Sequence, residues 1–347
     1  MYKKILIATI GYGSGHNMAA EALAESACRD FPGSDVWVVD FLSYDGGLRD
    51  KLRSAFYFLT IKFTPGAYHF IYQSLADYKW FSNLFFRPYL KKMKKFVNNF
   101  SPDLIISTHV FCAMASSELK ARYPSIKAVH GVLTDFMDDT YWNTCRLDCF
   151  SVATEELRER MILNGVPEMT IEVKPFPVRQ VFHRKGNRKE LCGKIDPNLK
   201  PETYTVLVLG GGEGLGRIED VVKVLKEFPV QCLIVTGRNE KLRQRLDLLK
   251  QNYPRLFVFG YIENMYELMD ISDLCITKPG GATVAECLVK GLPMIACRPP
   301  LPGPETENMT FLSSKNLAEL CPTMDSLRKT MLKRIDDMIK NGRSDNG

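Results

Sequence analysis

Short apolar runs alternate with helical patterns along this chain of 347 residues, and the alternation occurs in two series. The first series opens with an apolar run at 5–10, and the second opens with one at 205–209. Continuous apolar runs separated by helical stretches are typical of parallel strands that are covered on both faces. We therefore predict two α/β domains, each built on a parallel sheet. The other predicted strands are 36–39, 104–106, 128–133, 231–236, 256–259, 274–277 and 294–296.

Each series turns at glycines directly after its first strand, at 11–15 and at 210–216. In open α/β sheets, ligands bind outside the carboxyl ends of the strands. Two such domains in tandem therefore predict a ligand in a cleft between two Rossmann-like domains. A stretch rich in proline and lysine separates the two series. The predicted bounds are 1–178 and 179–315 for the two domains, and 316–347 for a helical tail.

The charge and the cysteines narrow the class of protein. The formal net charge is +6, from 46 basic and 40 acidic residues. Nucleic-acid binders usually concentrate more positive charge, and an excess of this size fits an anionic partner such as a diphosphate or an acidic membrane surface. The ten cysteines form no C-x-x-C pair, which favours reduced cysteines in a cytoplasmic core and predicts no metal site. No apolar run approaches the ~18 residues of a membrane span.

A segment rich in aromatic residues lies between residues 53 and 97, and it ends in a cluster of lysines. One interpretation is a helical insertion that packs its aromatic side chains into the core. The other is a surface for the membrane interface, with aromatic rings among the headgroups and lysines facing anionic lipid. The two can hold on different faces of the same helices. The lysines are Lys91, Lys92, Lys94 and Lys95.

The first glycine turn ends in a histidine, in the order Gly-Tyr-Gly-Ser-Gly-His at 11–16. A dinucleotide-binding fingerprint needs a third glycine where His16 stands, so this histidine excludes the fingerprint even though Asp40 ends the next strand. A histidine in the first turn of the helix would face the ligand, and the positive end of the helix tends to lower its pKa. This suits a neutral imidazole that acts as a general base. A surface histidine that caps the helix is the alternative.

The second series contains two further glycine turns that could hold a phosphate. The turn at 210–216 has no P-loop lysine, which argues against a Walker-type ATPase, although its amides could approach a phosphate or a sugar. The other turn follows a strand that ends at Lys278, and a helix begins near Ala282. The amides of such a helix start and its dipole form a diphosphate site. Thr283 adds a hydroxyl donor, and Glu286 is placed to bind the ribose hydroxyls, unless it is an ordinary acid of the first helical turn.

Taken in order, these motifs resemble those of one family, from the first strand to about Asn308. The chain resembles the monogalactosyldiacylglycerol synthase and processive diacylglycerol glucosyltransferase family, which is related to the peptidoglycan lipid-linked N-acetylglucosaminyltransferase. The resemblance implies a GT-B fold, with an N-terminal acceptor and membrane-facing domain and a C-terminal domain that binds a UDP-sugar. The segments that carry it are 11–16, 132–135, 152–156, 210–216, 236–239, 260–286 and 302–308.

The family's reaction moves a hexose from a UDP-sugar to the hydroxyl of diacylglycerol with inversion, and it needs no bound metal or other cofactor. By motif, His16 is the expected base, and Asp135 is a second candidate or the group that orients His16. Around the donor, the resemblance places Arg238, Lys278 and Thr283 at the diphosphate. The full set of expected donor contacts is Gly15, Gly211, Gly212, Arg238, Ile262, Lys278, Gly280, Gly281, Thr283, Glu286 on the ribose, and Glu305 and Asn308 on the sugar.

Two positions depart from the family pattern. Pro304 stands where a glutamine is usual, and Asp139 stands where a histidine usually precedes Trp142 by three residues. The expected donor is therefore UDP-glucose or UDP-galactose, without a choice between them. The acceptor is diacylglycerol or a related lipid, at the cytoplasmic face of a membrane and without a nucleic-acid partner. The alternatives are a different lipid or small-molecule acceptor, and a non-catalytic UDP-sugar sensor, which would need no base.

Overall fold

The computed structural model describes residues 2–11, 14–45, 79–136, 141–212, 214, 217–297 and 304–340. The chain divides into two compact units. The N-terminal unit comprises Met1–Gln180, Gly280–Ala285 and Leu301–Phe311, and the C-terminal unit comprises Val181–Pro279, Glu286–Pro300 and Leu312–Gly347. Each unit contains one six-stranded parallel sheet, so the prediction of two α/β domains is confirmed.

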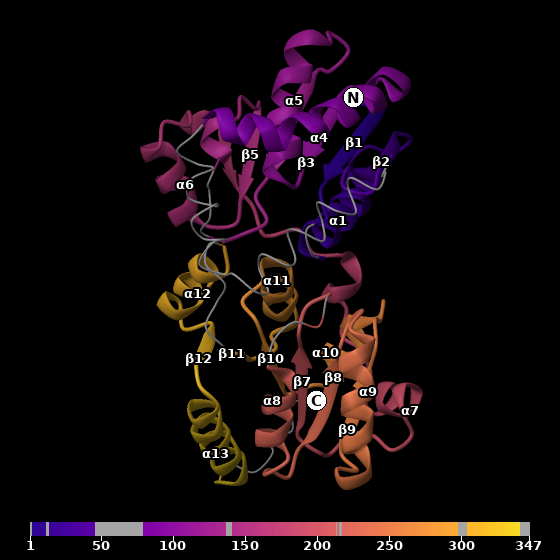
Figure 1. The fold of residues 1–347 in the computed structure, drawn as a ribbon, viewed down its shortest axis with the longest axis vertical. Helices are drawn as coiled ribbons and strands as arrows, with labels where there is room; N and C mark the ends of the chain where they lie inside the picture. Colours follow the sequence, from indigo (N-terminus) through magenta and orange to yellow (C-terminus); the bar gives the residue numbers. More distant parts are fainter. Residues whose placement is uncertain are drawn as a thin grey trace. The chain divides into compact units, whose positions relative to one another are not determined.

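The sheet of the N-terminal unit has the strand order β2-β1-β3-β4-β5-β6, with helices on both faces (Figure 1). Alternate residues of a strand point to opposite faces. Ile5 and Ile7 of β1 pack with α1, whereas Leu6 and Ala8 pack in the cluster that contains α4, α5 and α6. The elements are β1 (Lys4–Thr9), α1 (Gly15–Asp30), β2 (Asp35–Asp40), α4 (Lys79–Phe100), β3 (Leu104–Ser107), α5 (Val110–Arg122), β4 (Ala128–Val132), β5 (Cys149–Val152), α6 (Glu155–Leu163) and β6 (Ile171–Val173), with 3-10 turns η1 (Trp142–Thr144) and η2 (Glu168–Thr170).

The sheet of the C-terminal unit has the order β12-β11-β10-β7-β8-β9. Helices α8, α9 and α13 bury their apolar sides against one face of it, as Leu225, Leu246 and Met331 illustrate. The elements are η3 (Gln180–His183), α7 (Arg188–Ile195), β7 (Thr205–Leu209), α8 (Ile218–Leu225), β8 (Gln231–Val235), α9 (Glu240–Leu249), η4 (Lys250–Asn252), β9 (Leu256–Phe259), α10 (Met265–Asp270), β10 (Leu274–Thr277), α11 (Gly281–Lys290), β11 (Met294–Cys297), α12 (Pro304–Ser314), β12 (Ala318–Cys321) and α13 (Met324–Lys340).

The sequence patterns miss three strands: β5, β6 and β12. Two of them, β6 and β12, lie at sheet edges, where one side of the strand meets solvent and no continuous apolar run is needed. The segment 316–347, expected as a helical tail, therefore begins with a strand that pairs with β11 before α13 follows.

Helix α4 carries the described end of the segment expected at a membrane interface. Residues 53–78 of that segment lie outside the described residues. On α4, Phe86, Tyr89 and Phe96 are buried in the core, whereas Arg87 and Lys94 are exposed. These three aromatic side chains therefore take the core interpretation, and the two basic ones remain available to a surface.

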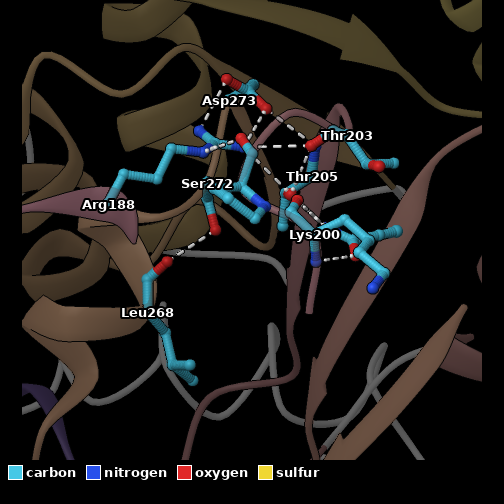
Figure 2. Close-up of polar contacts among 9 residues, drawn as sticks. Arg188, Lys200, Thr203, Thr205, Leu268, Ser272 and Asp273 are labelled. Atoms are coloured by element: carbon cyan, nitrogen blue, oxygen red, sulfur yellow. Dashed lines mark hydrogen bonds and ion pairs between the residues drawn. The ribbon is translucent and has the colours of Figure 1, made fainter. Parts of the chain in front are cut away.

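A polar network ties the amino ends of two strands in the C-terminal sheet (Figure 2). Arg188 begins α7, and its guanidinium donates two hydrogen bonds of 2.9 Å to Asp273, which precedes β10. It also donates to the carbonyl oxygens of Pro201 and Thr203, at 2.8 and 3.1 Å. Asp273 accepts the backbone N–H of Thr205, the first residue of β7, at 2.7 Å. The network joins α7, β7 and β10 at the edge opposite their carboxyl ends.

No helix among the described residues is long and apolar enough to cross a membrane. Within the same residues, no group of three or more histidine, cysteine, aspartate or glutamate side chains is placed to hold a metal ion.

Candidate active site

In the N-terminal sheet, the direction in which successive strands are added reverses between β1 and β3. The chain passes from β1 to β2 on one side and then continues with β3 on the other side. In open parallel sheets, ligands bind at such a switch point, outside the carboxyl ends of the strands. The loop after β1 leads to His16 in the first turn of α1, and the loop after β3 contains Thr108 and His109. The predicted base therefore lies at the switch point.

Two groups hold one nitrogen of the His16 ring. Nδ1 lies 3.0 Å from the carbonyl oxygen of Thr108 and 2.7 Å from the hydroxyl of Thr134, which follows β4. A carbonyl oxygen can only accept a hydrogen bond, so we assign the ring proton to Nδ1. The neutral ring then carries its lone pair on Nε2. This is the tautomer that a general base needs if its substrate approaches from the Nε2 side.

The surroundings of His16 keep its imidazole neutral. Burial lowers the pKa of His16, while the hydrogen bond to the Thr108 carbonyl and the charge of Asp40 partly offset this effect. The direction agrees with the expectation from sequence, but the main cause is burial. Asp40 also holds the glycine turn, because its Oδ1 accepts the backbone N–H groups of Gly11 at 3.0 Å and of Leu42 at 2.9 Å.

Asp135 and Asn308 contact each other in the N-terminal unit. Asn308 Nδ2 donates to Asp135 Oδ1 at 3.0 Å, and Asn308 Oδ1 accepts the backbone N–H of Phe136 at 2.8 Å. Asn308 is only 1% exposed, and the Phe136 ring stacks on that of Phe311 with centroids 4.9 Å apart. In this structure, Asn308 anchors the loop after β4, and the Thr108 carbonyl and the Thr134 hydroxyl are the groups recorded at His16 Nδ1.

The start of α11 lies close to the same loop. A Cβ atom on Gly281 would stand 2.2 Å from the carbonyl oxygen of Thr134, so glycine is required there. A Cβ on Gly15 would make an ordinary contact of 3.7 Å with Ala282. The N-terminal unit thus brings Gly15, His16 and Gly281 around Thr134. Glu305, in the first turn of α12, is half-buried.

The C-terminal sheet has its own switch point, between β7 and β10. From β7 the chain builds β8 and β9 on one side, and β10, β11 and β12 follow on the other. The two loops that flank this point contain Gly211 and Lys278, and the Lys278 Cε atom lies 3.1 Å from where a Cβ of Gly211 would be. Gly211 has a φ of +71°, a conformation that glycine adopts without strain. The lysine side chain therefore extends over the glycine turn.

The neighbouring loop after β8 supports that turn. Arg238 donates its backbone N–H to the Gly212 carbonyl at 2.9 Å. Gly237, with a φ of +57°, lies so close that a Cβ would stand 2.2 Å from the same oxygen. The Arg238 guanidinium lies 5.5 Å from the ring centroid of Tyr261, a side chain that is 55% exposed and precedes Ile262. The Arg238 side chain therefore lies beside an aromatic ring.

Three further expected donor residues belong to the turn that starts α11. Gly280 has open space where a Cβ would be, and Thr283 and Glu286 are half-buried in the first turns of the helix. Asp139 and the residues 302–303 of the last motif lie outside the described residues, as do 12, 13, 213, 215 and 216 of the glycine turns.

Solved structures of similar fold cover nearly the whole chain. MurG of Acinetobacter baumannii superimposes with a TM-score of 0.58 at 16% identity, over 95% of this chain and 90% of that one. MnaA of S. aureus, solved with UDP, gives a TM-score of 0.62 at 12% identity, over 96% and 88%. Anabaena HepE, solved with UDP-glucose, gives 0.58 at 14% identity, over 98% and 91%. Together with two parallel α/β units, this likeness defines the class as the GT-B fold.

Sequence comparison identifies the family. Residues 16–178 match the family described as monogalactosyldiacylglycerol (MGDG) synthase, and residues 205–346 match the glycosyltransferase family 28 C-terminal domain. A processive diacylglycerol beta-glucosyltransferase of Bacillus cytotoxicus is 33% identical over 91% of this chain and 81% of its own length. The enzyme of that name from Bacillus licheniformis is 28% identical over 99% and 91%. The chain belongs to this glycosyltransferase family.

Proposed function

We propose that this protein transfers a hexose from a UDP-sugar to the hydroxyl of diacylglycerol, with inversion at the anomeric carbon. Family membership supports the reaction class. The observation that carries the mechanism is the position of His16 at the β1/β3 switch point, with Nδ1 held by Thr108 and the lone pair assigned to Nε2. A protein that only sensed the nucleotide would have no use for a base in this state.

In the proposed reaction, His16 Nε2 accepts the proton of the acceptor hydroxyl. The oxygen forms a bond to the anomeric carbon of the sugar, and the bond from that carbon to the diphosphate breaks. The electron pair leaves with UDP, and the proton on His16 is then released to solvent. Inversion follows because one displacement occurs on the side opposite the leaving group.

The charge that develops on the diphosphate would be met at the second switch point. Lys278 brings an ammonium group over the Gly211 turn, and the N-terminus of α11 offers amides that have no acceptor within the helix, together with the positive end of its dipole. We propose that these groups act without a metal cofactor. Thr283 would add a hydroxyl donor, and Glu286 would accept hydrogen bonds from the ribose.

We propose glucose as the transferred hexose, with galactose as the competing choice. The named relatives are beta-glucosyltransferases, whereas the description of the N-terminal family names a galactolipid synthase. Glu305, in the first turn of α12, is a candidate for contact with the sugar hydroxyls.

We propose that the protein works at an anionic membrane surface, on the cytoplasmic face. Support comes from α4, where Arg87, Lys91, Lys94 and Lys95 are exposed at spacings that place them along one side of the helix. Lys95 pairs with Asp45 at 2.7 Å, so the other three provide the excess positive charge. Such a row attracts anionic lipid headgroups.

A screen of donors against acceptors tests the proposal. Purified protein would be given UDP-glucose, UDP-galactose or UDP-N-acetylglucosamine with vesicles containing diacylglycerol, ceramide or a sterol, and products would be identified by mass spectrometry. We expect hexosyldiacylglycerol from one UDP-hexose only. Products formed on ceramide or sterol alone would establish the other-acceptor alternative. UDP binding with no product from any pair, unchanged in His16→Ala, would establish the sensor.

A further inference from the structure

A second histidine lies beside the proposed base. His109 follows Thr108 in the loop after β3, and its ring meets the His16 ring edge to face, with centroids 4.9 Å apart and planes at 67°. Thr108 and His109 therefore approach His16 together, one through its backbone carbonyl and the other through its side chain. The motifs of the sequence assign no role to His109.

The hydrogen bond of His109 fixes its protonation state. Its Nδ1 accepts the backbone N–H of Phe111 at 3.1 Å and so caps the N-terminus of α5. Nδ1 must keep its lone pair to make this bond, so the proton of the neutral ring lies on Nε2. The two neighbouring rings therefore hold opposite tautomers. Protonating His109 at Nδ1 would break the cap and leave the N–H of Phe111 without its acceptor.

The charges around the pair favour at most one proton on it. Burial holds the pKa of His109 well below its usual range, and the charge of a protonated His16 lowers it further. Asp40, on β2, acts in the opposite direction on His16. Among the described residues, the neighbouring elements also carry the Cys112 thiol on α5, whose pKa is raised by burial, and Asp135 after β4, which accepts a hydrogen bond from Asn308. His109 thus stays neutral while His16 titrates.

We propose that His109 is a positioning residue for the base. By capping α5 it fixes the turn that aims the Thr108 carbonyl at His16 Nδ1, and its neutral ring covers one side of the His16 ring and keeps it desolvated. The catalytic consequence rests on the proposed function, in which His16 accepts a proton. The placement and protonation of the two rings do not depend on the proposed function.

Nitrogen NMR of protein labelled with 15N-histidine tests this without substrate, because two-bond correlations distinguish the tautomers. In the unmodified protein we expect His16 as the Nδ1–H form and His109 as the Nε2–H form. His109 should remain neutral at about pH 6, where an unperturbed histidine is mostly protonated. His16 in the Nε2–H form, or a protonated His109 at that pH, would overturn the proposal whatever any variant does.

Two variants separate the cap from the ring. His109→Asn keeps an acceptor for the Phe111 N–H but removes the ring, so His16 should titrate at higher pH while keeping its tautomer. His109→Ala removes both, so His16 should also become a mixture of tautomers. His130→Asn, on β4, is the matched control and should leave the His16 signals unchanged. An unchanged His16 titration in His109→Asn would remove the covering role of the ring.

The pH dependence of turnover tests the effect of His109 on catalysis. In His109→Asn the acid limb of kcat/KM against pH should move upward, and the rate at about pH 6 should fall about threefold relative to the rate at pH 8. A merely structural role would lower the amount of active protein and leave the shape of the profile unchanged. If no sugar transfer is found with any substrate pair, the proposed function fails, and the NMR result still decides the role of His109.

Discussion

The two switch points of this protein share a topology and differ in chemistry. At the β1/β3 point the sequence supplies two histidines, a threonine hydroxyl and a backbone carbonyl, arranged to set the position of one proton. At the β7/β10 point it supplies glycines and a lysine, with the start of a helix. Each point is created by the order of the strands, so topology decides where a ligand is held. In the proposed function, the residue types in the loops decide whether the point handles a proton or an anion.

A second contrast lies within the C-terminal sheet. Beyond the carboxyl ends of β7 and β10, the glycine turn after β7 packs closely on the loop after β8, and the side chain of Lys278, which follows β10, lies over that turn. At the amino ends of the same strands, Arg188 and Asp273 join each other and the surrounding backbone groups (Figure 2). A polar network that satisfies its own groups stabilises the fold, whereas a glycine turn with backbone amides suits a ligand. The same two strands therefore carry the proposed binding edge and a stabilising edge.

The largest effect is expected from removing the base. His16→Ala should lower turnover about 100-fold or more, the usual range for losing general-base catalysis. Affinity for UDP should barely change, because His16 is not among the proposed contacts of the diphosphate. Steady-state kinetics and calorimetric titration with UDP measure the two quantities. Full activity in His16→Ala would remove this residue from the mechanism, and a parallel loss of UDP affinity would abolish the contrast between the switch points.

Lys278→Met should have the next largest effect, this time on the donor. Losing a charge-assisted contact worth about 1.5–3 kcal/mol should weaken UDP binding by about 10- to 100-fold. Methionine keeps most of the length of the side chain, so the Gly211 turn stays covered. Lys223→Met, at an exposed position on α8, is the control and should bind UDP as the unmodified protein does. Equal affinities in the two variants would contradict a diphosphate at this switch point.

Arg188→Met tests the stabilising edge. Because about a quarter of the Arg188 and Asp273 side chains is exposed, the loss should lie below that of a fully buried pair, at about 2 kcal/mol of unfolding free energy. Urea denaturation followed by circular dichroism measures it. The folded variant should keep its affinity for UDP. A variant that is as stable as the unmodified protein but binds UDP weakly would reverse the roles of the two edges.

The sequence predicts the architecture better than it predicts the contacts of the base. The nine predicted strands are present, and most of them are buried parallel strands, which need continuous apolar runs. The glycine turns and His16 follow from their places after β1 and β7. No sequence pattern marks the partner of His16, since the Thr108 carbonyl is a backbone group that any residue supplies. His109 could have been predicted near His16, because it is a histidine that follows the buried strand β3 at the carboxyl edge of the sheet, where His16 also lies.

Asn308 shows a second limit of prediction from sequence. A motif places it with the sugar contacts, but motif order carries no information about burial. In the structure its amide is enclosed and bonded to Asp135 and to the Phe136 backbone. Whether such a residue meets a ligand or anchors a loop depends on how distant segments pack, which only the fold determines.

The smallest effect concerns the outer surfaces of the two units. If the N-terminal unit meets the lipid, Lys94→Gln on α4 should weaken binding to vesicles that contain anionic lipid by about fivefold, the usual contribution of one lysine near such a surface. Lys241→Gln, on α9 of the C-terminal unit, is the matched variant, because both lysines are exposed on helices. Flotation at low and high salt measures the difference, which should vanish as salt screens the charges. Equal losses in both variants would mean that net charge drives vesicle binding, and the assignment of lipid to the N-terminal unit would then fail.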